Sequence, residues 1–330
     1  MLARIDTGRG REGLFADQEP ELLRRLTEDA RIASITASNA IEGVVVEGGR
    51  AEEIAEGSRR FRNRNEREFA GYRDAVDELM RAEAPESLSL PFVLHLHRRL
   101  FAHSGGRGGH LKSDQNLIVS YESGQRQIVF EPTSPEQTEF QLGELLARYE
   151  AAKRDRVAHP LLLLGAFVVD FLAIHPVADG NGRLARLLTT HELLANGYGV
   201  ARYVSIEQPI FETKNGYYAA LYESQRDWHQ ADHTIWPWAL YFAGILVSAY
   251  EGFEEQVASA RAPTGTKRER VREHVLERGP GEFRRRDLER ALPGISDATV
   301  RMVLAELRAE GRIKADGAGR GARWRKIEGT

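Results

Sequence analysis

Twelve consecutive residues bring together the groups that phosphate chemistry needs, in the order His175-Pro-Val-Ala-Asp-Gly-Asn-Gly-Arg-Leu-Ala-Arg186. They hold a base, a carboxylate, an amide, two glycines and two arginines, directly after an apolar stretch. Helical periodicity resumes at Leu184, so the segment is expected at a helix N-terminus, where unpaired N–H groups and the helix dipole attract phosphate. Gly180 and Gly182 carry no Cβ, which lets an anion approach the backbone closely. The segment predicts an anion-binding turn.

The charged side chains of this segment indicate the kind of anion. Arg183 and Arg186 lie three residues apart on neighbouring faces of the first helical turn, and two guanidiniums suit a polyphosphate better than a single phosphate. Asp179 supplies one hard oxygen, which matches Mg²⁺ or Mn²⁺ held mainly by phosphates and water. His175 titrates close to neutral pH and is the candidate general base. Together they predict a site for a nucleoside triphosphate, a divalent metal and a base.

A simpler interpretation is a surface turn with a helix cap at Asp179 or Asn181. A lone Gly-Asn-Gly would favour that interpretation. The whole set of groups behind a buried apolar helix favours the phosphate site instead.

The segment resembles the signature of Fic-domain proteins, H-P-F-x-[DE]-G-N-G-R-x-x-R, at eight of its nine defined positions. The departure is Val177, at a packing position where phenylalanine is usual. The resemblance implies transfer of AMP from ATP to a protein hydroxyl, with His175 as base and Asp179 on the metal. It places the phosphates on the N–H groups of residues 180–182, and the two arginines, Arg183 and Arg186, on the β and γ positions.

Two further segments resemble Fic proteins, and the likeness spans roughly residues 20–250. The segment around Gln127-Ile-Val-Phe130 is similar to the Fic flap, a hairpin that pairs with the target backbone and covers the nucleotide. Tyr217 and Tyr218 resemble the tyrosine pair near the adenine and ribose, and Gln225 is a further contact on the same helix. The nucleotide-binding residues implied are thus Gly180, Asn181, Gly182, Arg183, Arg186, Tyr217, Tyr218, Gln225, Gln127, Ile128, Val129 and Phe130. Taken alone, the hairpin and tyrosines would be typical of packing.

Ser38-Asn-Ala-Ile-Glu42-Gly43 matches the family's inhibitory pattern, [ST]-x-x-x-E-[GN]. Ser38 and Glu42 are one helical turn apart, and the resemblance implies that the Glu42 carboxylate reaches Arg186 and misplaces ATP. In some relatives the same glutamate orients water for the removal of AMP, so Glu42 could serve two reactions. The alternative is an ordinary surface glutamate.

The elements that must position these residues are mainly helical. Periodicity predicts helices over 20–41, 67–82, 91–102, 137–154, 159–174, 184–196, 217–228 and 235–257, and a hairpin of 116–121 with 126–130. The start, up to about Gln18, is glycine- and arginine-rich and is predicted to be mobile. Its Gly8-x-Gly10-x-x-Gly13 has no preceding strand and is predicted to be a flexible arm. His95 and His97 lie on different helix faces, with no zinc pattern around them.

Residues 266–330 are predicted to form a separate domain. Helices are predicted over 268–278, over 283–292 and from the N-cap Ser296 to Glu310, followed by a basic hairpin with a glycine-rich tip. This order resembles a winged helix-turn-helix, usually a DNA-binding module, and dimerisation or docking is the alternative. From Thr266 onward 17 Lys and Arg face 11 Asp and Glu, a net +6 within a chain of net charge −3.

The expected fold is mainly α, a Fic-type helical core with a small β-hairpin flap and a C-terminal winged helix. We assign residues 1–88 to an N-terminal region with the inhibitory helix, 89–260 to the catalytic core and 266–330 to the winged helix. The absence of cysteine excludes disulfides and thiolate metal sites. The polar start lacks a signal peptide, and the longest apolar stretch, 161–174, contains Asp170 and is too short to span a bilayer. A cytoplasmic protein without membrane association is expected.

Three functional hypotheses remain. The first is a regulated protein adenylyltransferase that acts on a hydroxyl-bearing target protein, which could be the chain itself. A homodimer is compatible with this hypothesis. The second is a DNA-binding regulator whose core is a nucleotide-gated switch, which would not need the base His175. The third is another Fic chemistry, such as phosphate or phosphocholine transfer. In the phosphate-transferring relatives a lysine typically stands where this chain has Gly182, which disfavours that chemistry.

Overall fold

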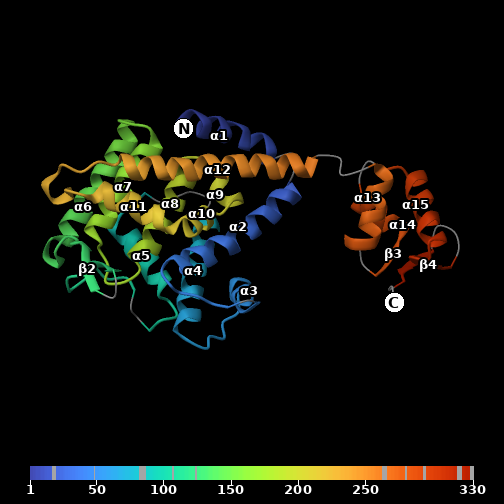
Figure 1. The fold of residues 1–330 in the computed structure, drawn as a ribbon, viewed down its shortest axis with the longest axis horizontal. Helices are drawn as coiled ribbons and strands as arrows, with labels where there is room; N and C mark the ends of the chain where they lie inside the picture. The colour runs from blue at the N-terminus through green and yellow to red at the C-terminus, as the bar shows by residue number, and fades with distance from the viewer. Residues whose placement is uncertain are drawn as a thin grey trace. The chain divides into compact units, whose positions relative to one another are not determined.

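The structure of the chain is a computed structural model that describes residues 1–16, 20–47, 49–81, 87–105, 108–122, 125–261, 266–278, 281–292, 295–317 and 322–327. The chain divides into two units, residues 1–257 and 258–330, which are described separately (Figure 1). Helices dominate both units, as the sequence predicts.

The predicted anion-binding turn lies between two helices of the larger unit, α7 (Pro160–Ile174) and α8 (Asn181–Ala195). α7 is apolar around nearly its whole circumference, and most of its side chains are buried. α8 contacts α7, α5 (Leu90–Leu100), α4 (Arg64–Arg81) and α2 (Pro20–Ile41). Because α8 is surrounded in this way, several helices can place side chains at its N-terminus.

Outer helices complete the larger unit. α6 (Pro135–Asp155) and α11 (Lys214–Gln225) both pack on α7. α12 (Trp236–Arg261) is the long helix that crosses Figure 1, and its aromatic side chains pack against Tyr217 of α11. Short helices that the sequence pattern did not predict connect these elements: α3 (Gly49–Ala55), α9 (Val200–Tyr203), α10 (Glu207–Glu212) and the 3₁₀ turn η1 (Trp228–Gln230).

The predicted hairpin is present as β1 (Ile118–Glu122) and β2 (Gln125–Phe130), paired antiparallel. Ile118 lies opposite Phe130, and an irregularity between Ile118 and Val119 shifts the register of the remaining pairs. The hairpin is anchored beyond β2, where the Thr133 N–H donates to the carbonyl of Ala173 at 3.3 Å. This bond ties the base of the hairpin to the end of α7.

The prediction of a mobile N-terminus is wrong, because Leu2–Ala16 form a helix, α1, that lies along α12 (Figure 1). Ile5 is fully buried, and Asp6 accepts a hydrogen bond from Tyr198 at 3.2 Å. Gly8 allows the close approach: a Cβ there would lie 2.6 Å from the Tyr250 ring. The three glycines weaken the helical signal, and tertiary contacts supply the stability that propensity lacks.

The smaller unit begins with α13 (Lys267–Glu273), closed by a capping box between Thr266 and Glu269, and a π-helical turn over His274–Arg278. The helix predicted over 283–292 is wrong at its start: β3 (Glu282–Arg284) comes first, and α14 (Arg285–Ala291) follows. Residues 282–284 become a strand because β5 (Arg323–Lys326) offers them an antiparallel partner.

α15 (Asp297–Ala309) completes the helices of this unit, and its predicted N-cap is confirmed: Ser296 accepts from the Thr299 N–H at 3.3 Å. β4 (Ile313–Asp316) pairs with β5, giving the antiparallel order β3-β5-β4. Pro293, Gly294 and most of the predicted tip, residues 318–321, lie outside the described residues. The core of the unit is apolar: Val271, Val275, Phe283, Leu288, Leu292, Ile295, Val300, Val303, Leu304, Leu307 and Ile313.

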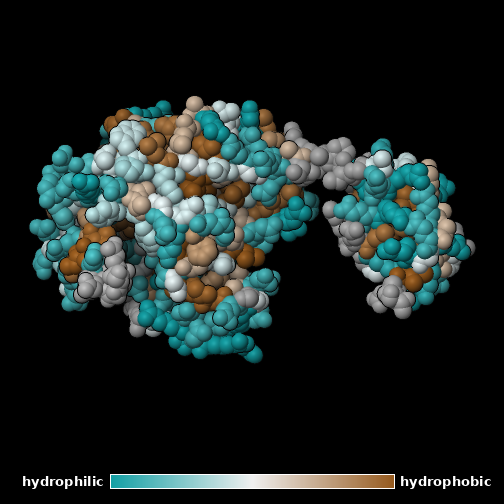
Figure 2. Space-filling model, viewed as in Figure 1, coloured by the Kyte–Doolittle hydropathy of each residue, from teal (hydrophilic) through white to brown (hydrophobic). Residues whose placement is uncertain are grey.

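Hydrophobic residues on the face of the larger unit drawn in Figure 2 gather in separate patches within a mostly hydrophilic surface. Among the residues that the structure describes, every helix falls short of the length and apolar content that a bilayer crossing requires.

Candidate active site

His175 caps the C-terminus of α7 in a left-handed conformation, with φ 53° and ψ 59°. Its N–H donates to the Phe171 carbonyl at 2.9 Å, and its Nδ1 lies 3.2 Å from the carbonyl of Leu172. Because a carbonyl can only accept, Nδ1 carries the proton of the neutral ring and Nε2 keeps a free lone pair. Burial, reinforced by the nearby Lys112, lowers the pKa of His175 to about 4. The imidazole is therefore neutral, and able to act as a base, at neutral pH.

The turn after His175 is held by the side chain of Asn181. Its Oδ1 accepts from the Val177 N–H at 3.0 Å, and its Nδ2 donates to the Val177 carbonyl at 2.6 Å. Val177 is fully buried, so the residue that departs from the Fic signature still fills a packing position. The amide of Asn181 thus shapes the turn.

The two glycines at the N-terminus of α8 allow other side chains to approach the backbone closely. Gly180 is the N-cap with φ 86°, and a Cβ on it would meet the side chains of Leu100 and Phe101 at 2.9 and 3.0 Å. A Cβ on Gly182 would lie 2.2 Å from Oε1 of Glu42. A carboxylate therefore already occupies the space above Gly182, at the positive end of the α8 dipole.

Arg186 holds that carboxylate in place. Its Nη2 lies 2.9 Å from Oε1 of Glu42 and donates to the Ser38 carbonyl at 2.9 Å, while its Nε donates to Ser38 Oγ at 2.7 Å. Although burial opposes it, the charge of Glu42 raises the pKa of Arg186. Arg186 is almost fully buried, and its Nη1 has no hydrogen-bond partner among the described residues.

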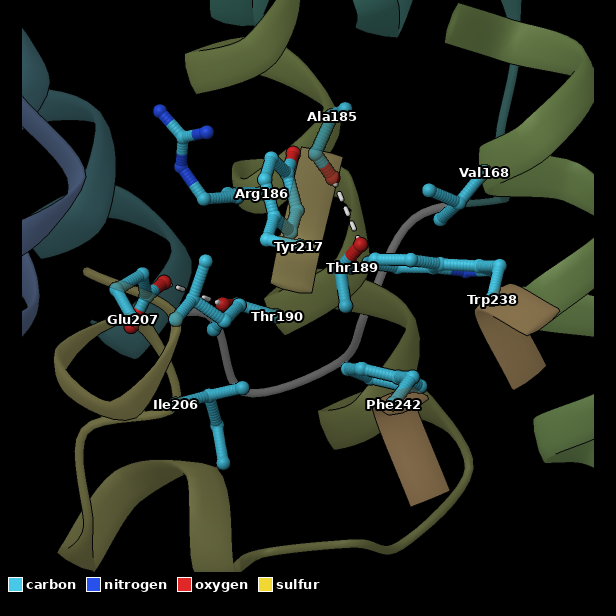
Figure 3. Close-up of a pocket in the computed structure, with 11 residues that line it drawn as sticks. Val168, Ala185, Arg186, Thr189, Thr190, Ile206, Glu207, Tyr217, Trp238 and Phe242 are labelled. Carbon is cyan, nitrogen blue, oxygen red and sulfur yellow. Dashed lines mark hydrogen bonds between the residues drawn. The ribbon is translucent and has the colours of Figure 1, made fainter. Parts of the chain in front are cut away.

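Figure 3 shows Arg186 and Tyr217 at the edge of a cavity of about 10 Å³, roughly the space for one water molecule. The guanidinium of Arg186 points away from the cavity. The remaining lining residues are Val168, Ala185, Thr189, Thr190, Ile206, Glu207, Ile210, Trp238 and Phe242. The cavity is too small for a nucleotide, so we place the candidate site at the N-terminus of α8 instead.

Arg183 points to a different partner from Arg186. It is 2% exposed, forms an ion pair with Glu68 of α4 at 2.9 Å and stacks over the ring of Phe101 at 5.3 Å. Burial works to raise the pKa of Glu68, but the hydrogen bond from Arg64 and the charge of Arg183 hold it below its usual value. Within the described residues, Arg183 Nε and Nη1 are buried without a hydrogen-bond partner.

Asp179 is the exposed member of this group, with 54% of its side chain accessible. Arg64 Nη2 lies 3.2 Å from its Oδ2, and Arg183 Nη2 lies 3.7 Å from its Oδ1. The described residues contain no cluster of three His, Cys, Asp or Glu side chains that could hold a metal alone. One accessible carboxylate fits Mg²⁺ or Mn²⁺ whose other ligands are phosphates and water.

His97 supports the backbone of the motif, a role that sequence analysis missed. Its Nδ1 accepts from the Gly109 N–H at 3.0 Å, which leaves Nε2 to donate to the Asp179 carbonyl at 3.2 Å. Burial lowers the pKa of His97 to about 4, so this arrangement is neutral. The sequence indicated only that His95 and His97 lie on different helix faces, and nothing in it predicted the contact.

The tyrosines lie on α11, whose first residue contacts the C-terminal end of α2. Tyr217 is buried and packs edge-on against Tyr218, whose side chain is partly exposed. Lys214, at the start of the same helix, lies 5.8 Å from the centre of the Tyr218 ring and donates to the carbonyl of Ile41 at 2.5 Å. Gln225 is buried and donates to the Val169 carbonyl at 3.2 Å, so its amide joins α11 to α7.

The residues expected in the flap differ in exposure. Gln127 and Ile128 are exposed, and Val129 and Phe130 are half-buried. Phe130 stacks on His229, with ring centres 5.6 Å apart. Within the described part of β2, the side chains of Gln127 and Ile128 are therefore the accessible ones.

Residues 87–193, which contain the whole turn from His175 to Arg186, match the Fic/DOC family model. The chain therefore carries a Fic/DOC domain, which confirms the coarse prediction from the motif. It is 26% identical over 205 residues to the protein adenylyltransferase Fic of Nematostella vectensis, covering 60% of this chain and 45% of that protein. It is also 26% identical over 221 residues to the protein adenylyltransferase fic-1 of Caenorhabditis elegans, covering 62% and 39%. The chain thus spans less than half the length of these curated relatives.

The fold is that of Fic-family proteins. A crystal structure of a Fic family protein from Desulfovibrio desulfuricans G20 aligns with a TM-score of 0.67 and 24% identity, over 100% of this chain and 95% of that one. The mainly helical fold expected from the sequence is therefore confirmed.

Proposed function

We propose that this chain transfers AMP from ATP to a Ser, Thr or Tyr hydroxyl of a protein and that Glu42 restrains the reaction. The distant relatives named as protein adenylyltransferases support the reaction class. One observation carries the proposal: a carboxylate lies against Gly182 and Arg186 at the N-terminus of α8. The place where a phosphate is expected is thus built for an anion.

The proposed chemistry is one in-line displacement. The hydroxyl oxygen attacks the α-phosphorus, the bond from that phosphorus to the pyrophosphate oxygen breaks, and pyrophosphate leaves. His175 Nε2 accepts the hydroxyl proton, while Nδ1–H on the Leu172 carbonyl keeps the ring oriented. The protein contributes positioning and electrostatic stabilisation.

The phosphates would rest on the N–H groups at the start of α8, with donors from Arg183 and Arg186. Asp179 would hold Mg²⁺ or Mn²⁺, which when bound would neutralise phosphate charge. Arg64 now pairs with this carboxylate and would have to share or release it. Of the two tyrosines, the partly exposed Tyr218 is the better candidate for a contact with the adenine or the ribose. We revise Gln225 to a packing role because its amide donates to the Val169 carbonyl.

The exposed edge of β2 would receive the target protein's backbone by strand addition. Gln127 and Ile128 are exposed there, and the base of the hairpin is tied to Ala173, two residues before His175. A hydroxyl presented at this edge would thus be held in register with the base.

Restraint by Glu42 follows from competition. While its carboxylate occupies Arg186, the γ-phosphate lacks that cation and meets a like charge. The same carboxylate could orient water for the removal of AMP from a modified protein. Both AMP transfer and AMP removal would then depend on the position of Glu42.

The test uses ATP labelled on either the α- or the γ-phosphate. We expect the α-label to enter protein, more in Glu42→Gly than in wild type, and the γ-label to stay in solution. Transfer of the γ-label would indicate a kinase instead. No transfer of either label by Glu42→Gly, to itself or to a cell extract, would contradict the proposed function.

For the smaller unit we propose duplex DNA binding as a second function. Its antiparallel β3-β5-β4 sheet and capped α15 have the order of a winged helix, with exposed Arg323 on β5. Several arginines are already paired within the unit: Arg272 with Glu310, Arg301 with Asp297 and Arg325 with Glu282. The positive charge available to DNA is therefore smaller than the net charge suggests.

A further inference from the structure

One loop binds the backbone on both sides of His175. The Nζ of Lys112 donates to the Ile174 carbonyl at 3.0 Å, and the Lys112 N–H donates to the Pro176 carbonyl at 2.9 Å. The Nδ2 of Asn116 lies 3.3 Å from the carbonyl of His175 and 2.8 Å from that of Val177. Four consecutive carbonyls, 174–177, are thus held by two residues.

The two side chains also hold each other. Lys112 Nζ donates to Asn116 Oδ1 at 2.9 Å, and Lys112 is 4% exposed. Burial lowers the pKa of Lys112 to about 8. An ammonium is costly to bury, and its place at the C-terminal end of α7 offsets part of that cost, because the helix dipole is negative there.

His175 needs such support because a left-handed backbone is unfavourable for a residue with a Cβ. A conformation of this kind persists only where the surroundings over-determine it. We propose that Lys112 and Asn116 are positioning residues that hold His175 in its reactive orientation. This proposal rests on the proposed function, in which His175 is the general base.

Among the residues that the structure describes, few charges act on the imidazole, so the effect of Lys112 can be separated from that of the others. The charged groups that act on the His175 ring are Lys112, which favours its neutral form, and Glu42, which favours its protonated form. Loss of the ammonium should therefore raise the pKa of His175, and loss of Glu42 should lower it.

The same loop reaches the hairpin that would hold the target. β1 begins two residues after Asn116, and Gln115 Nε2 donates to the Pro132 carbonyl just beyond β2 at 2.8 Å. Both ends of the hairpin are thereby fixed to the segment that fixes His175. A bound hydroxyl and the base would keep their relative position through this shared support.

The alternative is that Lys112 only caps α7, with no effect on the reaction. The test places Lys112→Met, Lys112→Arg and Asn116→Ala in a Glu42→Gly background and measures kcat, the KM for ATP and the equilibrium binding of ATP. We expect Lys112→Met and Asn116→Ala to lower kcat roughly tenfold to a hundredfold, because small displacements of a reacting group cost that much. ATP binding should stay within about twofold, and Lys112→Arg should recover most of kcat.

A second measurement follows the His175 ring by NMR in the nucleotide-free protein, with His175→Ala to assign the signal. Lys112→Met should move the titration midpoint of the imidazole to higher pH, while the neutral change Asn116→Ala should leave it in place. The acid limb of the kcat profile should move with the midpoint.

Two results would overturn the proposal. The first is an unchanged kcat in Lys112→Met and Asn116→Ala proteins that are folded. The second is a fall of kcat and ATP binding together in these variants, with the titration midpoint of His175 unchanged in Lys112→Met. If the Glu42→Gly parent transfers no AMP, the proposed function fails. The NMR titration then still decides whether Lys112 controls His175.

Discussion

Glu68 and Arg183 form an ion pair at 2.9 Å in which both side chains are almost fully buried. Arg64 and Asp179 extend the pair to a ring of four charges that joins α4 to the N-terminus of α8. The ring fixes the arginine and the carboxylate of the candidate site from a helix more than a hundred residues earlier in the sequence. It also makes α4 part of the site.

Glu68→Gln should destabilise the fold and impair the site together. Removing one partner of a buried ion pair leaves an uncompensated charge, so we expect a loss of about 3 kcal/mol in the free energy of unfolding. Urea denaturation measures this loss, and Glu139→Gln, at an exposed position on α6, is the control. Equal stability of the two variants would show that the pair contributes little.

Glu42→Gly should transfer AMP faster than wild type, on the order of a hundredfold, because Arg186 becomes available and the α-phosphorus can align. ATP should also bind more tightly once the like charge has gone. Initial rates of self-modification in matched Mg²⁺ and ATP measure the first effect. Glu47→Gly is the control, since Glu47 lies outside the Arg186 contacts. Rates equal to wild type in Glu42→Gly would leave Glu42 as an ordinary helix residue.

His175→Ala should abolish transfer and leave ATP binding largely intact, because the proposed phosphate contacts come from α8. In the Glu42→Gly parent, the rate should hold as pH falls from 7 to about 5, since burial lowers the pKa of His175 to about 4. The lost Glu42 charge should lower that pKa further. A steep fall of the rate near pH 6.5 would show that the base titrates as if exposed.

Acid should destabilise the larger unit well above the pKa of its carboxylates. Burial lowers the pKa of His97 to about 4 from 6.5, so the unfolded state binds a proton below about pH 6.5 that the folded state does not. The stability from this residue is complete above that pH and is lost as pH falls toward 4. We expect a loss of about 1–3 kcal/mol between pH 7 and 5 that is smaller in His97→Gln. An equal loss in both proteins would assign the acid sensitivity elsewhere.

The full chain should bind duplex DNA with a marked salt dependence if the smaller unit is a DNA-binding module. Each phosphate contact should add roughly 0.9 to the slope of log affinity against log salt. Arg323→Ala should remove about one phosphate contact and lower the slope by roughly 0.9. Arg148→Ala, which changes an exposed side chain on α6, should leave the slope unchanged. Absence of binding at low salt would favour docking or dimerisation for this unit.

The sequence predicted the helices that bury a clear apolar face, and α2 begins and ends at the predicted residues. α1 was missed because its stability comes from Tyr250 and Tyr198, which a local pattern does not contain. In the site, the motif grouped His175, Asp179 and the arginines because they are neighbours in sequence. Their partners Glu68, His97 and Lys112 were not predicted, since each reaches the motif from a distant segment without a pattern of its own.

Lys214 links α11 to the C-terminal end of α2 through one hydrogen bond. It starts the helix that carries Tyr217 and Tyr218 and holds the carbonyl of Ile41, the residue next to Glu42. If a nucleotide displaces the bond from Lys214 to Ile41 when it binds, part of its binding free energy is used to move Glu42. By thermodynamic reciprocity, any partner that moves Glu42 first must strengthen nucleotide binding by the same factor. Nucleotide affinity and the displacement of Glu42 are then thermodynamically linked, so a change in one changes the other by the same free energy.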